Sequence, residues 1–245
     1  MASSVRLYVE HPLGPGQRVP LAAPQAHYLL NVMRLAAGAE VLAFNGRDGE
    51  WRAALEPDGR RGGALACLAQ TRPQGAAADL WLLFAPLKKA RTDFLVEKAV
   101  ELGAGRLLPV DTAFTSSERV REDRLRAHAV EAAEQCGATT VPEVAAIAPL
   151  AKVLAGWPGG RRLWFCDEAE GAAGGPAALA AFAAAGPGPA AILTGPEGGF
   201  SEAERARLRQ FTFVSPVSLG PRILRAETAA LAALTLWQAA AGDWR

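Results

Sequence analysis

Short apolar runs alternate with helix-forming stretches from residue 79 onward, and this alternation is the feature that most limits the fold of the chain. The runs are DLWLLFAPL, RLLPVDT, RRLWFCDE, AAILTG and FTFVSPVSLG, and stretches such as TDFLVEKAVELGA and SEAERARLRQF separate them. Strands that alternate with helices predict an α/β fold with a mainly parallel sheet covered on both faces. Ligands bind such sheets at the carboxyl ends of their strands. The loops after Phe165, Leu193 and Ser218 are therefore the predicted ligand-binding loops.

The first 72 residues have a different pattern, with short strands, turns and one short helix. RLYVE is a predicted strand, and AEVLAFNGRDGEWRAALE predicts two strands joined at the turn signal NGRDG. HYLLNVMRL has the spacing of a short amphipathic helix. Residues 70–79 combine Pro, Gly and small residues, which is typical of a linker. We therefore predict one domain over residues 1–72 and a second over residues 73–245.

The composition excludes several classes of protein. The 245 residues include 26 basic and 25 acidic side chains, for a formal net charge of +1, so a uniformly basic surface is excluded while a local basic patch is not. The three cysteines form no CxxC pair and there are three histidines, so we expect no metal site. The N-terminus lacks the apolar core of a signal peptide, and no apolar run is long enough to span a membrane. These features predict a reduced, cytoplasmic protein without a membrane segment.

The segment LTGPEGGFSEAE (193–204) places a Gly-rich turn between a predicted strand and a predicted helix. Ser201 and Glu204 have the S-x-x-E spacing of a capping box, so the helix is predicted to begin at Glu202. The turn matches neither G-x-x-x-x-G-K-[ST] nor G-x-G-x-x-G, and the carboxylate of Glu197 would repel a triphosphate. A neutral or cationic ligand is compatible with this turn. The alternative is a tight turn that binds no ligand.

A second loop, in SLGPRILRAETAALAALTLWQ (218–238), leads from a strand through a Gly-Pro turn into a nearly all-apolar helix, which is typical of a buried helix. Arg222, Arg225 and Glu227 cluster where this helix begins. Basic side chains are unfavourable there because of the helix dipole, so we expect an external partner to stabilise them. A salt bridge between Arg225 and Glu227 is the structural alternative. The helix carries more apolar surface than one sheet face covers, which predicts a twofold-symmetric dimer.

Together, GPEGGFSEAE and LGPRILRAETA resemble the signature of the ribosomal RNA small-subunit methyltransferase E family, in the SPOUT superfamily. The stretches KKARTDFLVEKAVELG, RLRAHAVEAAEQCG and HYLLNVMRL extend the resemblance over nearly the whole chain. The resemblance implies an N-terminal PUA-like β-barrel for RNA and a SPOUT-type parallel sheet with a C-terminal trefoil knot. It also implies a homodimer that uses S-adenosylmethionine to methylate N3 of a uridine in 16S rRNA, within the 30S subunit or a late precursor.

The resemblance assigns the two loops to S-adenosylmethionine, whose sulfonium cation and lack of phosphate suit a turn that contains Glu197 and no lysine. The loop over residues 166–170 is expected to close a third side of the site. The implied cofactor contacts, made mainly through backbone groups, are Leu193, Thr194, Gly195, Pro196, Glu197, Gly198, Gly199, Leu219, Gly220, Ile223, Leu224 and Arg225.

The reaction that the resemblance implies requires two catalytic groups. The N3 proton of uridine must leave, and the anion that spreads onto O2 and O4 must be stabilised. Arg225 is the candidate for stabilising this anion, and Glu227 is the candidate base, with Glu197 as a second choice. The alternative for Glu227 is a salt bridge or a favourable charge at a helix N-terminus.

Candidate RNA contacts are Arg6 and Arg34 in the first half of the chain and the cluster Lys88, Lys89 and Arg91 before a predicted helix. Bound phosphate would explain positive charge at a helix start, although each side chain could instead be an ordinary solvated charge. Two segments depart from the family pattern. Ala138 stands where an arginine is common, and residues 111–120 lack the common Arg-Ser pair, for which Arg119 is a candidate replacement. Both departures are expected near the RNA.

Two other functions are compatible with parts of the chain. One is a non-catalytic RNA-binding protein that keeps a methyltransferase fold, and the intact GPEGGF and LGPRILR motifs argue against it. The other is an enzyme that acts on a small metabolite. The separate N-terminal domain argues against that function, because a small substrate needs no such domain.

Overall fold

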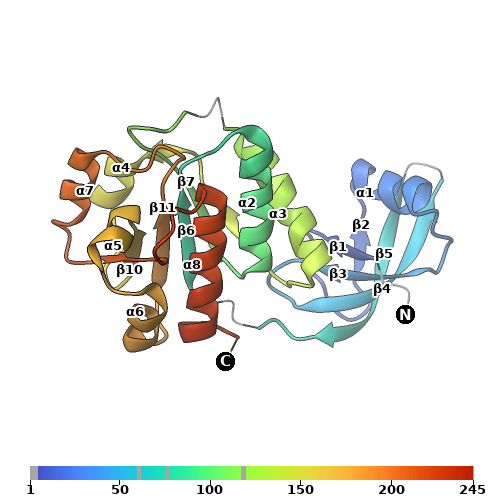
Figure 1. Cartoon of the computed structure of the whole chain (residues 1–245). Coiled ribbons are helices and arrows are strands. Elements are labelled where there is room, and N and C mark those ends of the chain that lie inside the picture. Colours follow the sequence, from blue (N-terminus) through green and yellow to red (C-terminus); the bar gives the residue numbers. More distant parts are fainter. Residues whose placement is uncertain (1–4, 60–61, 76–77, 117–119, 245) are drawn as a thin grey trace. The chain divides into compact units, whose positions relative to one another are not determined.

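The structure is a computed structural model, and it describes residues 5–59, 62–75, 78–116 and 120–244. The chain separates into two compact units (Figure 1). Residues 1–76 and 133–141 form the N-terminal unit, and residues 77–132 and 142–245 form the C-terminal unit. The predicted domain boundary after residue 72 therefore does not account for residues 133–141, which follow that boundary in the chain and yet belong to the N-terminal unit.

The N-terminal unit contains a five-stranded sheet in the order β1-β3-β4-β5-β2. Its pairs are antiparallel except for β1 and β3, which are parallel. Buried Val19, Leu29, Val41, Leu55 and Leu65 lie in its core. The elements are β1 (Arg6–Tyr8), β2 (Arg18–Pro20), α1 (Ala23–His27), the π-helical turn η1 (Tyr28–Val32), β3 (Glu40–Phe44), β4 (Glu50–Asp58) and β5 (Gly62–Arg72).

The predicted strands and short helix of this unit are present, while the pattern missed two strands. RLYVE, EVLAF and EWRAALE contain β1, β3 and β4, and the predicted helix at HYLLNVMRL is the π-helical turn that follows α1. The missed strands are β2, which has three residues, and β5, which reaches Arg72 and so includes the first residues of the predicted linker. The alternation of apolar and polar residues in β5 is weak, because alanine occupies positions 64, 66 and 69.

The C-terminal unit is an α/β structure, and every strand pair described in it is parallel, which confirms the predicted fold class. Its sheet follows the order β12-β10-β11-β6-β7-β8, and β9 pairs with β7. The trefoil knot that the resemblance implies stays a prediction. The strands are β6 (Leu80–Phe84), β7 (Arg106–Asp111), β8 (Glu143–Val144), β9 (Ala148–Pro149), β10 (Arg162–Cys166), β11 (Ala190–Thr194) and β12 (Val214–Val217).

Helices connect these strands and cover the sheet, and α2 and α8 run side by side (Figure 1). The five residues of β11 are all buried, as expected for a central strand with both faces covered. Among the helices, the sequence pattern missed α5, a short helix rich in Gly and Ala. The helices are α2 (Lys89–Glu101), α3 (Glu122–Cys136), α4 (Leu150–Ala155), α5 (Glu168–Ala173), α6 (Ala178–Ala185), α7 (Glu202–Leu208) and α8 (Ala226–Ala241). No helix within the described residues is long and apolar enough to cross a membrane.

Candidate functional site

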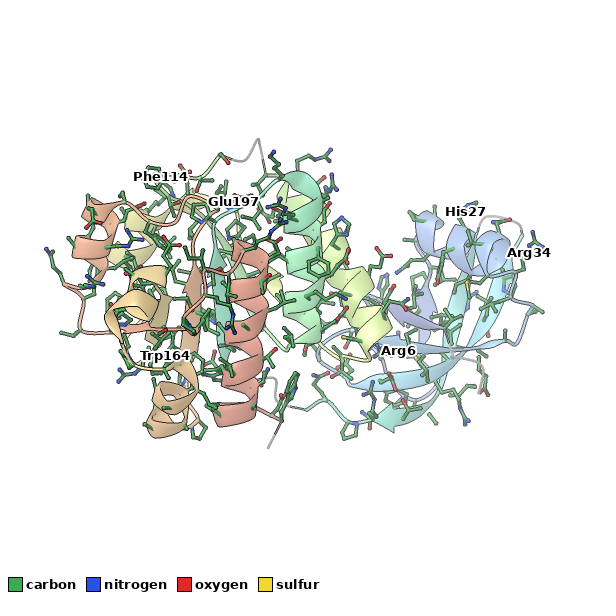
Figure 2. The ribbon with its side chains drawn as sticks, viewed as in Figure 1. Arg6, His27, Arg34, Phe114, Trp164 and Glu197 are labelled. Atoms are coloured by element: carbon green, nitrogen blue, oxygen red, sulfur yellow. The ribbon has the colours of Figure 1, made fainter. Side chains whose placement is uncertain are left out.

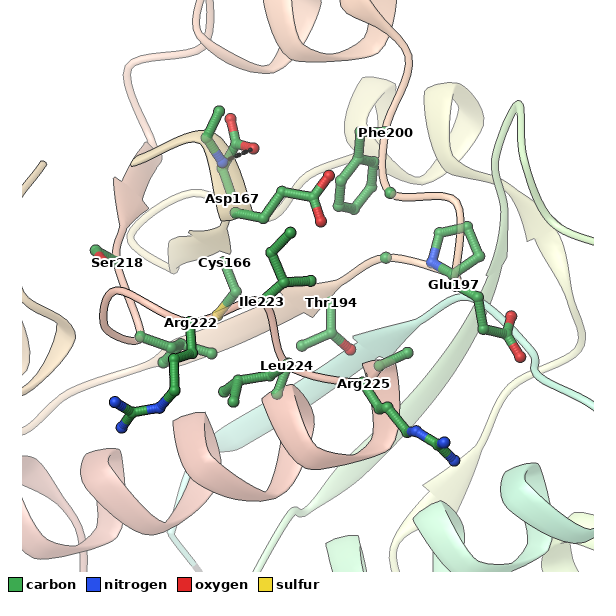
Figure 3. A pocket seen from close by; sticks show the side chains of 18 of the residues that line it. Cys166, Asp167, Thr194, Glu197, Phe200, Ser218, Arg222, Ile223, Leu224 and Arg225 are labelled. Atoms are coloured by element: carbon green, nitrogen blue, oxygen red, sulfur yellow. Dashed lines mark hydrogen bonds between the residues drawn. The ribbon is translucent and has the colours of Figure 1, made fainter. Parts of the chain in front are cut away.

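A cavity of about 880 Å³ lies at the carboxyl ends of β10, β11 and β12. Residues from the loops after these three strands line it, together with the start of α8 and Arg91 of α2 (Figure 3). This is the edge of the sheet at which ligands of parallel α/β folds bind. The three loops selected from the sequence therefore meet in one concave site.

The turn after β11 is fixed at both ends by local hydrogen bonds. The N–H of Gly199 donates to the carbonyl of Pro196 at 2.9 Å, which closes the turn. Ser201 and Glu204 form the predicted capping box, in which the backbone N–H of Ser201 donates to Oε2 of Glu204 at 2.9 Å and the N–H of Glu204 donates to Oγ of Ser201 at 3.3 Å. The backbone that lines the cavity is thus held in place before any ligand binds.

Gly198 and Gly199 are glycines for different reasons. Gly199 has φ of +68° and lines the cavity, and a Cβ atom there would lie 2.5 Å from Oε1 of Glu168. Gly198 does not line the cavity, and its φ is not positive. A Cβ at Gly198 would instead lie 3.1 Å from Cβ of Phe114, so the residue that limits this position is an aromatic side chain on another loop.

The loop after β12 supplies an apolar wall to the cavity. Ile223 lines the cavity with 84% of its surface exposed, and the half-buried Leu224 follows it. Thr194, at the end of β11, lines the same space, and its buried Oγ1 has no hydrogen-bond partner within the described residues. An exposed apolar wall beside an unsatisfied hydroxyl is suited to a ligand with both a flat apolar face and polar edges.

Two cationic side chains flank this loop, and Figure 3 shows the guanidinium groups of Arg222 and Arg225 directed away from each other. Both residues line the cavity and are exposed. Arg225 is the N-cap residue of α8, and its side chain makes no cap hydrogen bond. Because no ion pair of Arg225 occurs within the part of the chain that the structure describes, its charge is available to a ligand.

Arg91, like Arg205, carries a further basic group in the cavity, and it is paired. Its Nη1 donates to Oε1 of Glu197 at 3.2 Å, and its Nε lies 3.8 Å from Oε1 of Glu227. Arg91 therefore has partners within the chain, and its contact with RNA phosphate stays a prediction. Glu227 does not line the cavity and its carboxylate lies near Arg91 in place of Arg225, and its role as a base stays a prediction.

The loop after β10 closes a third side of the cavity, as expected for residues 166–170. The buried carboxylate of Asp167 accepts from Arg205 at 3.0 Å and from Arg209 at 3.1 Å, which ties α5 to α7. Burial raises the pKa of the Cys166 thiol to about 12, so this cavity-lining group is neutral at physiological pH. Within the described residues, no group of His, Cys, Asp or Glu is arranged to hold a metal ion.

Most of the predicted cofactor residues meet in the cavity. Leu193 does not line it, because its side chain is fully buried in the hydrophobic core beneath the sheet edge. Gly198 packs against Phe114, as described above. Those that line the cavity are Thr194, Gly195, Pro196, Glu197, Gly199, Leu219, Gly220, Ile223, Leu224 and Arg225.

Arg6 is a structural residue of the N-terminal unit. Its Nε donates to the buried Glu50 at 2.9 Å, and its two terminal nitrogens donate to the carbonyls of Ala133, Glu134 and Ala138. The side chain is 11% exposed and lies over the ring of Phe44. Every guanidinium nitrogen of Arg6 thus donates within the unit, and its contact with RNA stays a prediction.

The other basic candidates are not among the residues that line the cavity. Arg34 is exposed in the N-terminal unit and has φ of +55°, a conformation that few non-glycine residues adopt (Figure 2). Lys88 is exposed at the N-cap of α2. Lys89 begins α2, and its side chain lies outside the described part of the structure, as does the whole of Arg119. RNA contacts by Arg34, Lys88 and Lys89 stay predictions.

Sequence reasoning missed several cavity residues. Local signals could have identified two of them. Phe200 is an aromatic residue directly after GPEGG, and Arg205 forms an i,i+4 pair with the next arginine but one. No local signal identifies Arg91 as a cavity residue, because it lies 106 residues from Glu197. The other cavity residues outside the predicted loops are Val217, Ala226 and Ala229, while Cys166, Asp167, Glu168, Ala169, Ser218, Pro221 and Arg222 lie in predicted loops without having been assigned to the cofactor individually.

Comparisons with known proteins agree with this architecture. A family model described as an RNA methyltransferase domain matches residues 74–238, and one described as an RNA methyltransferase PUA domain matches residues 21–62. A ribosomal RNA small subunit methyltransferase E from Synechocystis is 31% identical over 88% of this chain and 71% of the relative. One from Rickettsia conorii is 27% identical over 94% of this chain and 93% of the relative.

Solved structures are similar over almost the full length. Ribosomal RNA small subunit methyltransferase E from Neisseria gonorrhoeae, bound to S-adenosylmethionine, has a TM-score of 0.80 at 27% identity, over 99% of this chain and all of that chain. A Legionella pneumophila protein in complex with the same cofactor has a TM-score of 0.83 at 26% identity, over 98% of this chain and 99% of that chain. By its fold, its two loops and these matches, the chain belongs to the ribosomal RNA small subunit methyltransferase E family.

Proposed function

We propose that this protein transfers the methyl group of S-adenosylmethionine to N3 of a specific uridine in 16S rRNA. Methyl transfer to RNA of the small ribosomal subunit follows from the family to which the chain belongs. The observation that carries the proposal is the cavity itself, in which the two Gly-Pro loops meet at the carboxyl edge of the sheet. The choice of uridine and of its N3 atom rests on the resemblance of these loops to the family signature.

The residues present fit S-adenosylmethionine. Ile223 and Leu224 offer an apolar wall for the adenine ring, and backbone groups of the two loops can read its edge. The unsatisfied Oγ1 of Thr194 has room for a polar group of the cofactor. Neither turn carries the lysine and ring of backbone N–H groups that a triphosphate site needs. In this proposal the cofactor-contacting residues are the ten predicted ones that line the cavity.

The chain's own residues align the substrate and stabilise charge. When bound, S-adenosylmethionine supplies an electrophilic methyl group. The cavity holds the uracil ring with N3 directed at that group, which is a positioning effect. Arg225 stabilises the negative charge that spreads onto O2 and O4 as the N3 proton passes to a carboxylate base, for which Glu227 and the cavity-lining Glu197 are the candidates. Its exposed guanidinium, with no acidic partner among the described residues, is free to do so.

RNA binding in this proposal involves both parts of the chain. Residues 1–72 form the RNA-binding domain and residues 73–245 the methyltransferase domain. Arg34 and Lys88 contribute exposed charge for phosphates, together with Lys89. The target uridine leaves its stack to reach the cavity. The substrate is the 30S subunit or a late precursor, which puts the reaction in the cytoplasm.

A homodimer is also part of the proposal. Apolar and small side chains of α8, with Phe94 of α2, line a shallow groove of about 470 Å³ that is open to solvent. Phe94 is 42% exposed, and the buried Oε2 of Glu227 in this groove has no hydrogen-bond partner within the described residues. A second copy of the chain would cover the apolar surface of this groove.

The test is transfer of a labelled methyl group to the RNA of 30S subunits taken from cells that lack this protein, under single-turnover conditions. We expect the wild-type chain to methylate one uridine at N3, as mapped by mass spectrometry. Arg225→Ala should lower the rate by about 10²-fold, as for loss of one oxyanion-hole donor, without weakening RNA binding. Arg207→Ala, an exposed arginine of α7, is the control. A wild-type protein that labels no RNA, or labels another atom, rules the proposal out.

A further inference from the structure

An exposed aromatic side chain stands beside the turn that lines the cavity. Phe114 is 50% exposed, and its Cβ would lie 3.1 Å from a Cβ built on Gly198. Gly198 is flanked by Glu197 and Gly199, which both line the cavity, while Phe114 itself does not line it. Figure 2 shows Phe114 near Glu197, on the loop that follows β7. The phenyl ring is therefore at the rim of the site.

The loop that carries Phe114 is held by hydrogen bonds on both sides of the ring. The N–H of Thr112 donates to Oγ1 of Thr115 at 2.9 Å, and the N–H of Thr115 donates to the carbonyl of Thr112 at 3.1 Å. The N–H of Ala113 donates at 2.8 Å to Oε1 of Glu204, whose other oxygen completes the capping box of α7. A fixed turn presents the ring to solvent, so little conformational entropy is lost when a partner binds it.

The surroundings of Phe114 suit RNA. Strands β11, β6 and β7 are neighbours in the sheet, so the loops after them share one edge. Lys88 follows β6 on this edge and is exposed, and the cavity with Arg225 follows β11. An exposed aromatic ring on the same sheet edge as cationic side chains suits the binding of unpaired bases, by stacking and by attraction to the backbone.

We propose that Phe114 stacks on an unpaired base next to the methylated uridine and so positions that uridine in the cavity. The inference rests on the proposed function. Removal of the target base from its stack leaves a neighbouring base with one uncovered face. The ring of Phe114, at the rim and outside the cavity, can cover that face while the target enters. Phe114 is thus a positioning residue that contacts the RNA and takes no part in the chemical step.

The experiment compares Phe114→Ala, Phe114→Leu and Phe114→Trp in RNA binding and single-turnover methylation of a small-subunit RNA fragment that contains the target. Stacking predicts that Ala and Leu each weaken RNA affinity about fivefold or more, and that Trp restores it. The affinity for S-adenosylmethionine and the salt dependence of RNA binding should stay unchanged, because no charge is removed. Trp244→Ala, which truncates another exposed aromatic side chain, three residues after the end of α8, is the matched control.

A second measurement identifies the base. RNA fragments with an abasic site at each nucleotide that flanks the target are bound to the wild-type chain and to Phe114→Ala. The effect of Phe114→Ala should vanish for the fragment that lacks the stacked base and persist for the others. Equal RNA affinity of the wild type and of Phe114→Leu overturns the inference. A change of the dimer mass in Phe114→Ala also overturns it, because the ring would then be a contact between subunits. If the wild type methylates no RNA, it is the proposed function that fails.

Discussion

Arg91 of α2 donates a hydrogen bond from Nη1 to Oε1 of Glu197 at 3.2 Å, joining a helix to a turn 106 residues away. The two side chains are 37% and 36% exposed, so the pair is moderately screened by solvent. The carboxylate in the Gly-rich turn is therefore largely neutralised. Attraction between Glu197 and a sulfonium cation, which the sequence suggested, is weaker than it would be for an unpaired carboxylate.

A double-mutant cycle tests this neutralisation. Glu197→Gln alone should lower the affinity for S-adenosylmethionine by about twofold or less, because Arg91 already balances the charge. In an Arg91→Ala background the same change should cost more, since the carboxylate is then unpaired. Calorimetric titration of the four proteins measures the coupling, with Glu202→Gln, 95% exposed on α7, as the control. An identical loss in both backgrounds would show that the pair does not set the charge of the turn.

Replacements of two adjacent glycines should have separate effects. Gly199→Ala places a side chain at φ of +68° and against Glu168, so it should destabilise the protein by about 1–2 kcal/mol and weaken cofactor binding. Gly198→Ala should leave cofactor affinity near normal and displace Phe114, which lowers RNA methylation. Thermal unfolding and calorimetry distinguish the two, with Gly159→Ala as the control, since a Cβ there meets no atom within 4 Å. Loss of cofactor binding in Gly198→Ala would contradict this assignment.

The salt dependence of RNA binding should identify phosphate contacts. Lys88→Ala and Arg34→Ala should each weaken binding and reduce the slope of log affinity against log salt by about 0.7, the value for one single-strand phosphate contact. Lys152→Ala, exposed on α4, should leave the slope unchanged. A slope that is the same for Lys88→Ala and for the wild type would remove Lys88 from the RNA interface.

Glu50 should make the N-terminal unit sensitive to acid. Burial alone would raise its pKa, but hydrogen bonds from Arg72, Thr71 and Arg6 outweigh burial and hold the pKa below the usual 4.5. The carboxylate therefore adds stability above about pH 4.5, and this contribution is lost as the pH falls through the lowered pKa of the folded state. Unfolding measured against pH should show this loss in the wild type.

The matched variant for this pH effect is Glu50→Gln. It should cost about 3 kcal/mol at neutral pH, because it leaves the buried guanidinium of Arg6 without its counter-charge, and its stability should change less below pH 4.5. Glu40→Gln removes the exposed partner of Arg52 and should cost about 1 kcal/mol or less. Equal pH profiles for Glu50→Gln and the wild type would contradict the role of this carboxylate.

The proposed dimer should depend on the groove between α2 and α8. Leu231→Arg places a charge among the apolar side chains of this groove, so light scattering should change from twice the chain mass to the single-chain mass of 25.6 kDa. Leu179→Arg, on the exposed side of α6, should not change the mass. A wild-type chain that is monomeric at micromolar concentration rules the dimer out.

The sequence predicted those parts of the site that local chemistry determines. The capping box of Ser201 and Glu204 involves residues three positions apart, so its spacing is visible in the chain and α7 begins where predicted. The apolar runs that became β10, β11 and β12 are equally local, and the parallel arrangement placed the loops after them at one edge. Ten of the twelve predicted cofactor residues line the cavity for this reason.

Predictions for single charged residues were less successful, because a charge has many potential partners. Arg6 and Arg91 read from the sequence as exposed cations, and the structure pairs both within the chain. The sequence predicts Glu227 as a base, and its side chain is not among those that line the cavity. Nothing in the local pattern distinguishes a cation that pairs with a distant carboxylate from one that remains free for RNA.

By itself, the sequence determined most of the periodic elements, the Gly-rich turn after β11, the Gly-Pro turn after β12 and the helix that begins at Glu202, because hydrogen bonds and side-chain spacing within a few residues specify them. Only the tertiary structure decided which distant groups meet. Three features depend on how separate segments pack: the pairing of Arg91 with Glu197, the inclusion of residues 133–141 in the N-terminal unit and the packing of Phe114 on Gly198. Those contacts join segments far apart in the chain, and their free energy comes from burial and charge pairing that exist only after the chain has folded.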